Sequence, residues 1–258
     1  MSYSVQVVIP YLRFPWCIAD CLESFRESDI PVLIVDNSPD SDLDFEKHPH
    51  YPGFIMSPNL EIVYYPKNIG VAASWNLGLL KGADQTIICS QWTRLSQTEE
   101  ARVSERGLNT VVNHLQQYAN DYGLEFGDQI YHLRSVGRRQ VEEVGFFDEN
   151  FYPDHGEDYD YETRKFLANA ICAVWPYESE SFKDSQIQSI AHRTHKRDGV
   201  NDEQLRMKSY NYFKWGTNRL GEPREYAHPF GNPNNPIQFW PEVKGGSGID
   251  WQGKMMET

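Results

Sequence analysis

Short apolar runs alternate with amphipathic stretches along the amino-terminal third of the chain. Four runs rich in β-branched residues predict buried strands, at residues 5–9, 32–35, 62–65 and 86–89. Apolar positions at helical spacing predict a helix at residues 18–26, before the second of these strands. A further helix is expected at residues 71–81, before the fourth strand. Apolar strands separated by helices are typical of a parallel sheet covered on both faces. The chain is therefore expected to form an α/β fold with a mostly parallel sheet.

The rest of the chain is more helical and ends in an irregular segment. Ser96 and Glu99 have the spacing of a capping box, and apolar positions over residues 108–122 predict one face of a helix. Further strands are expected at 130–133 and 171–174, and further helices near 139–144, just after Gly156 and at 203–215. Five prolines then interrupt any periodicity. We expect one domain over residues 1–220 and an irregular tail over residues 221–258, which wraps the domain or contacts a partner.

Polar and small residues gather where the predicted strands end and helices begin. Pro10 and Tyr11 follow the first strand, and Asp36 follows the second. An asparagine- and glycine-containing stretch, 68–78, leads into the helix before the fourth strand. An acid-rich helix start, 156–164, follows a Gly-Phe-Phe-Asp-Glu turn. Sheets of this class bind ligands beyond the carboxyl ends of their strands, which directs attention to the loops after the first, second and fourth strands.

Together these stretches resemble the family 2 glycosyltransferases, a large group of inverting enzymes with the GT-A fold. The resemblance covers residues 5–220. It implies a Rossmann-like sheet with helices on both faces, and transfer of a sugar from a nucleotide-sugar donor to an acceptor. The acceptor class, which the sequence does not select, includes glycans, lipid-linked molecules and proteins.

The family pattern assigns the donor site to particular residues. The first loop, with Pro10 and Tyr11, and the carboxylate of Asp36 would hold the base and ribose of the nucleotide. A carboxylate at a strand end can accept hydrogen bonds from these groups, although a simple turn favours the same residues. A helix start made of small residues would approach the phosphate oxygens. The family pattern places Asn68, Gly70 and Asn76 there.

The acidic motif supplies the expected base. Inversion at the anomeric carbon is a single displacement, so the enzyme needs one carboxylate to take the proton of the acceptor. The resemblance gives this role to Asp158, with Glu157 beside it. Acidic residues also complement the dipole at a helix start, which accounts for part of the pattern.

The chain departs from the family after the fourth strand. Family members usually carry Asp-x-Asp there, and the two carboxylates bind a divalent cation on the diphosphate. Here the run is Ser90-Gln91-Trp92, so both carboxylate positions are lost. Serine and glutamine are poor ligands for a hard cation such as Mn²⁺ or Mg²⁺. We therefore expect these three residues to line the donor site and leave the metal ligands undefined.

Three explanations of this departure stay open. Cationic side chains such as Arg94, His192 or Arg193 could stabilise the leaving diphosphate in place of a metal. A weakly held metal could use Asp158 and His192 instead. Alternatively, the protein could be a scaffold that binds a nucleotide or glycan without turnover. His192 is the expected contact to the phosphates or metal, and His195 is its rival.

Charge and composition narrow the partner classes. A formal net charge of −13, from 37 acidic and 24 basic residues, disfavours binding to nucleic acid or anionic lipid. No apolar stretch is long enough for a membrane span, and the first residues lack the pattern of a signal peptide. The four cysteines form no CxxC pair, which favours buried thiols and a cytoplasmic location. The tail is also a candidate contact for a homo-oligomer.

Overall fold

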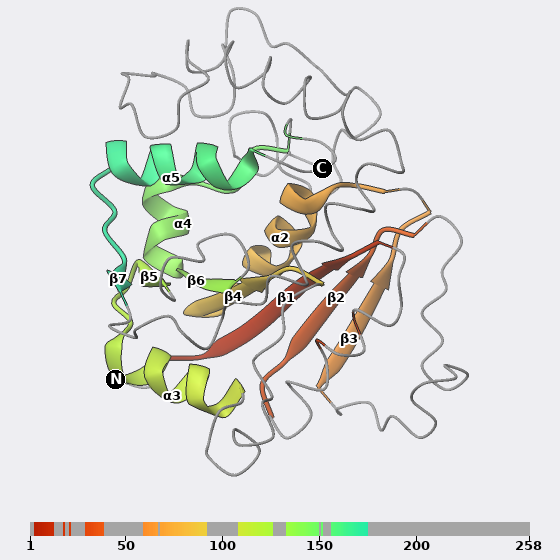
Figure 1. Cartoon of the computed structure of the whole chain (residues 1–258), viewed down its shortest axis with the longest axis horizontal. Coiled ribbons are helices and arrows are strands. Elements are labelled where there is room, and N and C mark those ends of the chain that lie inside the picture. Colours follow the sequence, from red (N-terminus) through yellow and green to blue (C-terminus); the bar gives the residue numbers. More distant parts are fainter. Residues whose placement is uncertain are drawn as a thin grey trace, which may run out of the picture.

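The computed structural model describes residues 3–12, 18, 21, 29–38, 59–66, 68–91, 108–125, 133–149, 151 and 156–174. Within them lies a seven-stranded sheet with the order β3-β2-β1-β4-β6-β5-β7 (Figure 1). The strands are β1 Val5–Tyr11, β2 Val32–Asp36, β3 Leu60–Tyr64, β4 Gln85–Cys89, β5 Gly123–Glu125, β6 Leu133–Gly137 and β7 Ala173–Val174. The helices are α2 Val71–Leu80, α3 Leu108–Tyr118, α4 Arg138–Val144 and α5 Glu157–Leu167.

The sheet is mixed, with a single reversed strand among those described. β1 pairs in parallel with β2 and with β4, and β2 pairs in parallel with β3. β6 runs antiparallel to both of its neighbours, β4 and β5, and β5 pairs in parallel with β7. The predicted mostly parallel α/β sheet is therefore confirmed.

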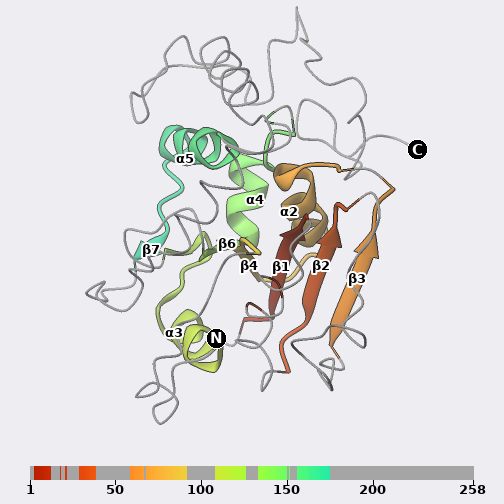
Figure 2. The same ribbon diagram turned by 45° about the vertical axis from the view of Figure 1, so that its right-hand side comes forward.

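Alternate residues of the central strands feed two apolar cores, one on each face. Val7 and Ile9 belong to the core that includes Leu115 of α3, together with the helical residues Ile18 and Cys21. The opposite core includes β-strand residues such as Val8, which pack with α2, α4 and α5. Figures 1 and 2 show these three helices on one side of the sheet and α3 on the other. Helices thus cover both faces, as the sequence predicts.

The close fit of α2 on β1 depends on a glycine. A Cβ atom at Gly78 would lie only 2.6 Å from Cβ of Val8, a distance that real side chains do not tolerate. Gln6, on the same strand, donates from Nε2 to the Gly78 carbonyl at 2.6 Å. The absent side chain therefore lets α2 lie directly on the strand whose end faces the candidate site.

The first strand continues through Pro10, two residues beyond the predicted end. Val7 N donates to Pro31 O and Asn37 N donates to Tyr11 O, so odd-numbered residues of β1 bond towards β2. The nitrogen of Pro10 therefore faces β4, where the ladder has already ended at the Val8–Ile88 pair. Proline fits here because no strand partner requires its missing N–H.

Two boundaries in the middle of the chain differ from the prediction. Helix α3 ends at Tyr118, and Tyr122, expected on its face, lies in a turn. Asn120 makes this turn, because its Oδ1 accepts from Tyr122 N at 3.0 Å and Gly123 N at 3.1 Å. β5 was not predicted, and β6 begins at Leu133, where the predicted strand was expected to end.

The cysteine prediction holds for the three cysteines described, because Cys21, Cys89 and Cys172 are free and buried. A hydrogen bond with Cys21, and then burial, raise the pKa of the Cys89 thiol well above its ordinary value. Cys17 lies outside the described residues, as do the capping box at Ser96, residues 130–132, the helix expected at 203–215, and the tail with its domain boundary. None of the described helices is long and apolar enough to cross a membrane.

Candidate functional site

The carboxyl ends of the parallel strands form one level edge. The register places Tyr11, Asp36 and Tyr64 side by side at the ends of β1, β2 and β3. The first turns of α2 and α5 lie towards this edge in Figures 1 and 2. The edge therefore gathers the stretches that the sequence singled out.

Asp36 occupies the end of β2 and is fully buried. Its Oδ1 accepts a hydrogen bond from Ser38 N at 2.8 Å, which closes a turn of the kind that aspartate favours. Its backbone carbonyl accepts from Tyr65 N at 3.0 Å and so continues the pairing with the β3 side. The turn interpretation of Asp36 is thus correct, and its role in holding a nucleotide stays a prediction.

Asn37 joins the end of β2 to the start of α2. Its Nδ2 donates to Ser74 Oγ at 2.9 Å, and its Oδ1 accepts from Ile69 N at 3.0 Å. Asn37 was not among the predicted site residues, because an asparagine in a cluster of turn formers gives no sign of a long-range partner. The two bonds hold the helix start beside Asp36.

The start of α2 leaves backbone donors without a side-chain cap. Gly70 stands at the N-cap position, just before the first turn, with a φ of 89°. It has no side chain, and no side-chain hydrogen bond caps this helix end. Asn68 Oδ1 instead accepts from Gly70 N at 2.8 Å, which shapes the approach to the helix. N–H groups without a cap at a helix start suit phosphate oxygens. The geometry fits the prediction for Asn68 and Gly70 without testing it.

The run that replaces Asp-x-Asp is built into the sheet edge. Gln91 Oε1 accepts from Leu12 N at 2.7 Å, and Gln91 Nε2 donates to Leu12 O at 3.3 Å. This side chain acts as a backbone mimic that ties the end of β4 to the end of β1. The carbonyl of Ser90 accepts a weak bond from Cys21 Sγ at 3.9 Å, and Trp92 lies outside the described residues.

These residues do not fit a divalent cation. The amide oxygen of Gln91, the better of the two potential ligands at 90 and 91, already accepts a backbone hydrogen bond. Across the part of the chain that the structure describes, no three His, Cys, Asp or Glu side chains form a group that could hold a metal. The metal ligands therefore stay undefined, and His192 lies outside the described residues.

Asn76 connects α2 to the turn that precedes α5. Its Nδ2 donates to Phe147 O and to Glu149 Oε1, both at 2.9 Å. Its Oδ1 accepts from Phe147 N at 2.8 Å, so the amide pairs with both backbone groups of one residue. Asn76 is fully buried. In this structure its side chain fixes the turn at 145–149, and contact with a donor stays a prediction.

The same turn is bound to α5 through aromatic and polar contacts. The ring of Phe147 stacks on Tyr161 with centroids 4.1 Å apart and also contacts Trp75 of α2 at 5.0 Å. Tyr161 donates from its hydroxyl to Gly145 O at 3.0 Å. Burial raises the pKa of this phenol, which therefore stays protonated. Helix α5 is thus joined to α2 through one shared aromatic residue.

The predicted catalytic pair lies in the first turn of α5. Gly156 precedes it with a φ of 106°, and a Cβ there would come within 2.8 Å of the Phe151 ring. Glu157 is 5% exposed, whereas Asp158 is half-buried and accepts at Oδ1 from Tyr159 N at 2.8 Å. The carboxylate that is more open to an incoming molecule is therefore that of Asp158.

The third acid of the motif has a structural partner. Asp160 is fully buried and accepts from Arg164 Nε at 2.8 Å, one helical turn later. Arg164 also donates from Nη1 to Val144 O at 2.9 Å, which joins α5 to the end of α4. Asp160 thus fixes the helix rather than adding a second open carboxylate beside Asp158.

Comparisons with known proteins give short or distant likenesses. No protein-family model matches the chain. A galactofuranosyl glycosyltransferase of Leishmania donovani is 43% identical over 47 residues, which are 17% of this chain and 11% of that protein. Among solved structures, the mannosyltransferase PcManGT from Pyrobaculum calidifontis, in complex with GDP-Man and Mn²⁺, aligns with a TM-score of 0.46 and 16% identity. TarS of S. aureus aligns with a TM-score of 0.49 and 12% identity.

The alignments cover only part of each protein, which limits the conclusions that they support. The alignment with the mannosyltransferase covers 70% of this chain and 59% of that structure, and the alignment with TarS covers 68% and 35%. This chain therefore spans about a tenth of the galactofuranosyl glycosyltransferase (11%) and less than two thirds of each structure. Two of the three proteins bear the name of a sugar transferase, and the activity of this chain is a matter for proposal.

Proposed function

We propose that this chain is an inverting glycosyltransferase of the GT-A type that takes a nucleotide-sugar as its donor. The observation behind the proposal is the junction of three elements at one sheet edge. Asn37 fixes the start of α2 beside Asp36, and Asn76 with Phe147 fixes the start of α5 to α2. A nucleotide site and a carboxylate for proton transfer are thereby held in one rigid unit.

The donor is assigned to the edge between β1 and α2. Tyr11 and Asp36 would meet the base and ribose, and the uncapped first turn of α2 after Gly70 would meet the phosphates. The 43% identity over 47 residues to a galactofuranosyl glycosyltransferase supports a sugar-nucleotide donor. It also makes nucleotide-linked galactofuranose one of the donors to test.

The chemical step is a single displacement at the anomeric carbon. The acceptor hydroxyl oxygen forms a bond to that carbon while the bond from the carbon to the phosphate oxygen breaks. The electron pair leaves with the nucleotide, and Asp158 takes the hydroxyl proton. Its partial exposure at a helix start, next to the buried Glu157, supports its assignment as the base.

The remaining parts of the proposal rest on sequence and on the buried thiols. Stabilisation of the leaving diphosphate is assigned to the cationic side chains Arg94, His192 and Arg193, and Trp92 is assigned to the lining of the donor site. The free thiols of Cys21, Cys89 and Cys172 support a reducing, cytoplasmic location. The domain of residues 1–220 is proposed to hold the site, and the tail of residues 221–258 to cover it or join subunits.

A thermal-shift screen tests the donor part of the proposal. UDP-, GDP-, dTDP- and CMP-linked sugars, including nucleotide-linked galactofuranose, are each added with Mn²⁺ and with EDTA. A ligand that binds only the native state stabilises it by mass action, by about 2.7 kcal/mol when the ligand concentration is a hundred times Kd, and therefore raises Tm. We expect one nucleotide class to raise Tm in EDTA. No shift with any donor would overturn the proposal.

A scaffold without turnover is the second candidate. The observation that favours it is the engagement of Gln91 with Leu12, which commits the run after β4 to tying strands together. This candidate predicts a nucleotide-dependent rise in Tm with no release of free nucleotide from any donor over hours. Turnover that disappears in Asp158→Asn would exclude it.

A further inference from the structure

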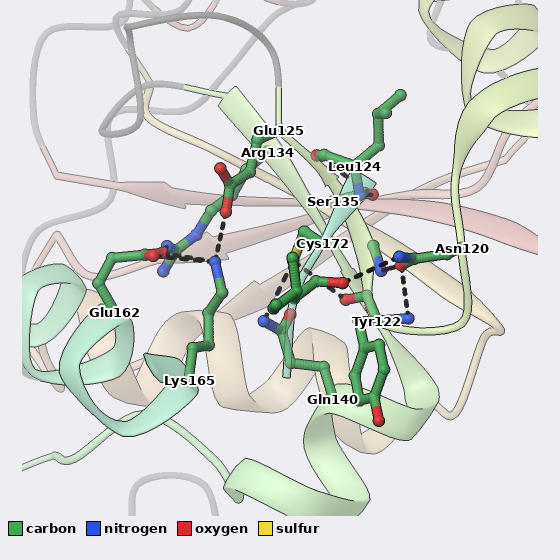
Figure 3. A network of polar contacts seen from close by, with 12 residues as sticks. Asn120, Tyr122, Leu124, Glu125, Arg134, Ser135, Gln140, Glu162, Lys165 and Cys172 are labelled. Atoms are coloured by element: carbon green, nitrogen blue, oxygen red, sulfur yellow. Dashed lines mark hydrogen bonds and ion pairs between the residues drawn. The ribbon is translucent and has the colours of Figure 1, made fainter. Parts of the chain in front are cut away.

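A cluster of four charged side chains, with two buried cations and two carboxylates that are 22% and 30% exposed, joins α5 to β5 and β6 (Figure 3). Arg134 is the second residue of β6, and its register partners are Ile88 of β4 and Glu125 of β5. Glu162 and Lys165 lie on α5, three residues apart. The side chains of Arg134 and Lys165 are only 4% and 7% exposed. Burying a charged group costs free energy even when the group is paired, so the presence of these two cations calls for an explanation.

The contacts within this cluster link three elements. Arg134 pairs from Nη1 with Glu162 Oε1, and Lys165 Nζ pairs with Glu125 Oε1. Lys165 Nζ also donates to both carboxylate oxygens of Glu162, at 2.9 and 3.0 Å. Burial alone would lower the pKa of Lys165, but the carboxylates outweigh it and the pKa is raised. Lys165 is therefore charged. With two acidic and two basic residues, the cluster of Glu125, Arg134, Glu162 and Lys165 is formally neutral.

The guanidinium of Arg134 also reaches the aromatic pair beneath the site. Its Cζ lies 5.3 Å from the ring centroid of Phe147 and 5.4 Å from that of Tyr161. These are the two rings that join α5 to the turn at 145–149. One side chain of the sheet thus contacts α5 at Glu162 and at Tyr161, on successive positions of the helix.

Helical geometry connects this cluster to the proposed base. Asp158, Glu162 and Lys165 stand at positions i, i+4 and i+7, so they follow one stripe of α5. A slip of one residue along a helix moves a side chain by about 1.5 Å and turns it by about 100°. Apolar packing tolerates small slides, whereas paired charges require particular partners, and fixing register is the best-attested use of buried ion pairs.

We propose that the Glu125–Arg134–Glu162–Lys165 cluster is a positioning device that sets the rotation and axial position of α5, and so the position of Asp158. The inference rests on the proposed function, because it concerns the base of that reaction. The four residues touch neither donor nor acceptor in this account. Their effect reaches the reaction through the helix, where a misplacement of about 1 Å costs about a hundred-fold in rate.

The test replaces all four residues by methionine, because removing one charge alone would leave its partner buried and unpaired. Concerted replacement by apolar residues of similar size is often neutral for stability or better. We expect a folded protein with unchanged KM for the donor and an unchanged nucleotide-dependent rise in Tm. We expect kcat, measured as nucleotide release from the donor, to fall by about 10- to 100-fold.

Two controls separate positioning from general damage. The double variant Glu61→Met with Lys81→Met removes an ion pair between β3 and the end of α2. Lys81 Nζ lies 2.6 Å from Glu61 Oε2, and the two side chains are 39% and 55% exposed. This variant should leave kcat unchanged. In the Asp158→Asn background, the four methionines should lower turnover no further, because the base is already absent. A kcat like that of the wild type in the four-methionine variant would overturn the proposal.

A second readout does not depend on activity. Asp160 N bonds Gly156 O at 2.9 Å in the first turn of α5, so hydrogen exchange of amides 159–162 reports the order of that turn. We expect exchange at least about ten-fold faster in the four-methionine variant. If the wild type releases no nucleotide from any donor, the proposed function fails, and hydrogen exchange alone then tests whether the cluster positions α5. Unchanged exchange would then refute the positioning role, and faster exchange would support it.

Discussion

The two halves of the sheet are held by different chemistry. Across β1, β2 and β4 the buried positions are largely apolar, and two cores close on their faces. Across β5, β6 and the helices beside them, buried positions include Arg134, Ser135 and Lys165, each with polar partners. The apolar half provides a platform that tolerates small adjustments. The polar half fixes particular partners, and through them the helix that starts with Glu157 and Asp158.

The candidate site lies where these halves meet. Asn76 of α2 belongs to the apolar half, yet its amide binds the backbone of Phe147 and the side chain of Glu149. Phe147 in turn contacts Trp75 on one side and Tyr161 on the other. The relative placement of donor edge and proposed base thus depends on a few contacts between the halves. Variants in each half, at this junction and at the surface test the contrast.

The largest effect on stability is expected in the polar half, at Arg164. Arg164→Met leaves the fully buried carboxylate of Asp160 without its paired cation. Loss of one partner of a buried pair costs about 3–5 kcal/mol in the free energy of unfolding, measurable by urea denaturation. The double variant Asp160→Asn with Arg164→Met should recover part of this loss. A single variant as stable as the wild type would contradict the contrast.

A smaller loss is expected at the junction. Asn76→Leu keeps the branching and the number of heavy atoms of the side chain but leaves the N–H and carbonyl of Phe147 without their side-chain partner. Loss of the partner of a buried polar group costs about 1–3 kcal/mol, so the free energy of unfolding should fall by about that amount, less than for Arg164→Met. The variant should also weaken donor turnover, since the turn before α5 loses its anchor. A denaturation midpoint equal to that of the wild type would show that the hydrogen bonds of the Asn76 side chain contribute little to stability.

The apolar half should respond more mildly to a conservative change. Ile87→Val in β4 removes one methylene from a fully buried position in the core on the α3 face. Such changes cost about 0.5–1.5 kcal/mol, and no polar group is left unpaired. Thermal and urea unfolding should both show this modest decrease, with donor turnover retained. A loss above that seen for Asn76→Leu would reverse the order of the two halves.

The smallest effect is expected at the surface. Lys81→Met removes the 2.6 Å ion pair with Glu61, whose side chains are 39% and 55% exposed. Water screens such pairs, so the free energy of unfolding should change by no more than about 1 kcal/mol. The urea midpoint measures this, and a loss comparable to that of Arg164→Met would mean that burial does not govern the ion pairs of this fold.

The difference between the apolar and the polar half of the sheet also explains which elements the sequence could predict. β1, β2 and β4 were predicted near their observed bounds because each contains a short run rich in β-branched residues, and α2 and α4 were also placed near theirs. β5 has three residues, and β6 carries Arg134 and Ser135 at buried positions, so no apolar pattern marks either strand. Their burial depends on partners far away in sequence, such as Glu162 for Arg134. Pattern alone contains no sign of such pairs.

Helix α5 and the site show the same limit. The helix was predicted to start just after Gly156, and it does, but its apolar positions do not mark its buried face. Phe166 is 69% exposed, whereas the buried residues of α5 are mainly charged or polar. Likewise, the sequence singled out Asn76 by type, while its partner Phe147 lies 71 residues away. Residue type singled out these side chains as candidates, and tertiary contacts decide what each of them binds in the structure.

Donor turnover by the wild type and by Asp158→Asn, measured side by side, tests the central claim most directly. The donor is the one that raises Tm, and the readouts are released nucleotide and, by NMR, the anomeric configuration of the sugar product. We predict inversion by the wild type and a loss of about 100- to 10,000-fold in Asp158→Asn, with the nucleotide-dependent rise in Tm retained. No turnover by the wild type, retention of configuration, or equal turnover by both proteins would contradict the account.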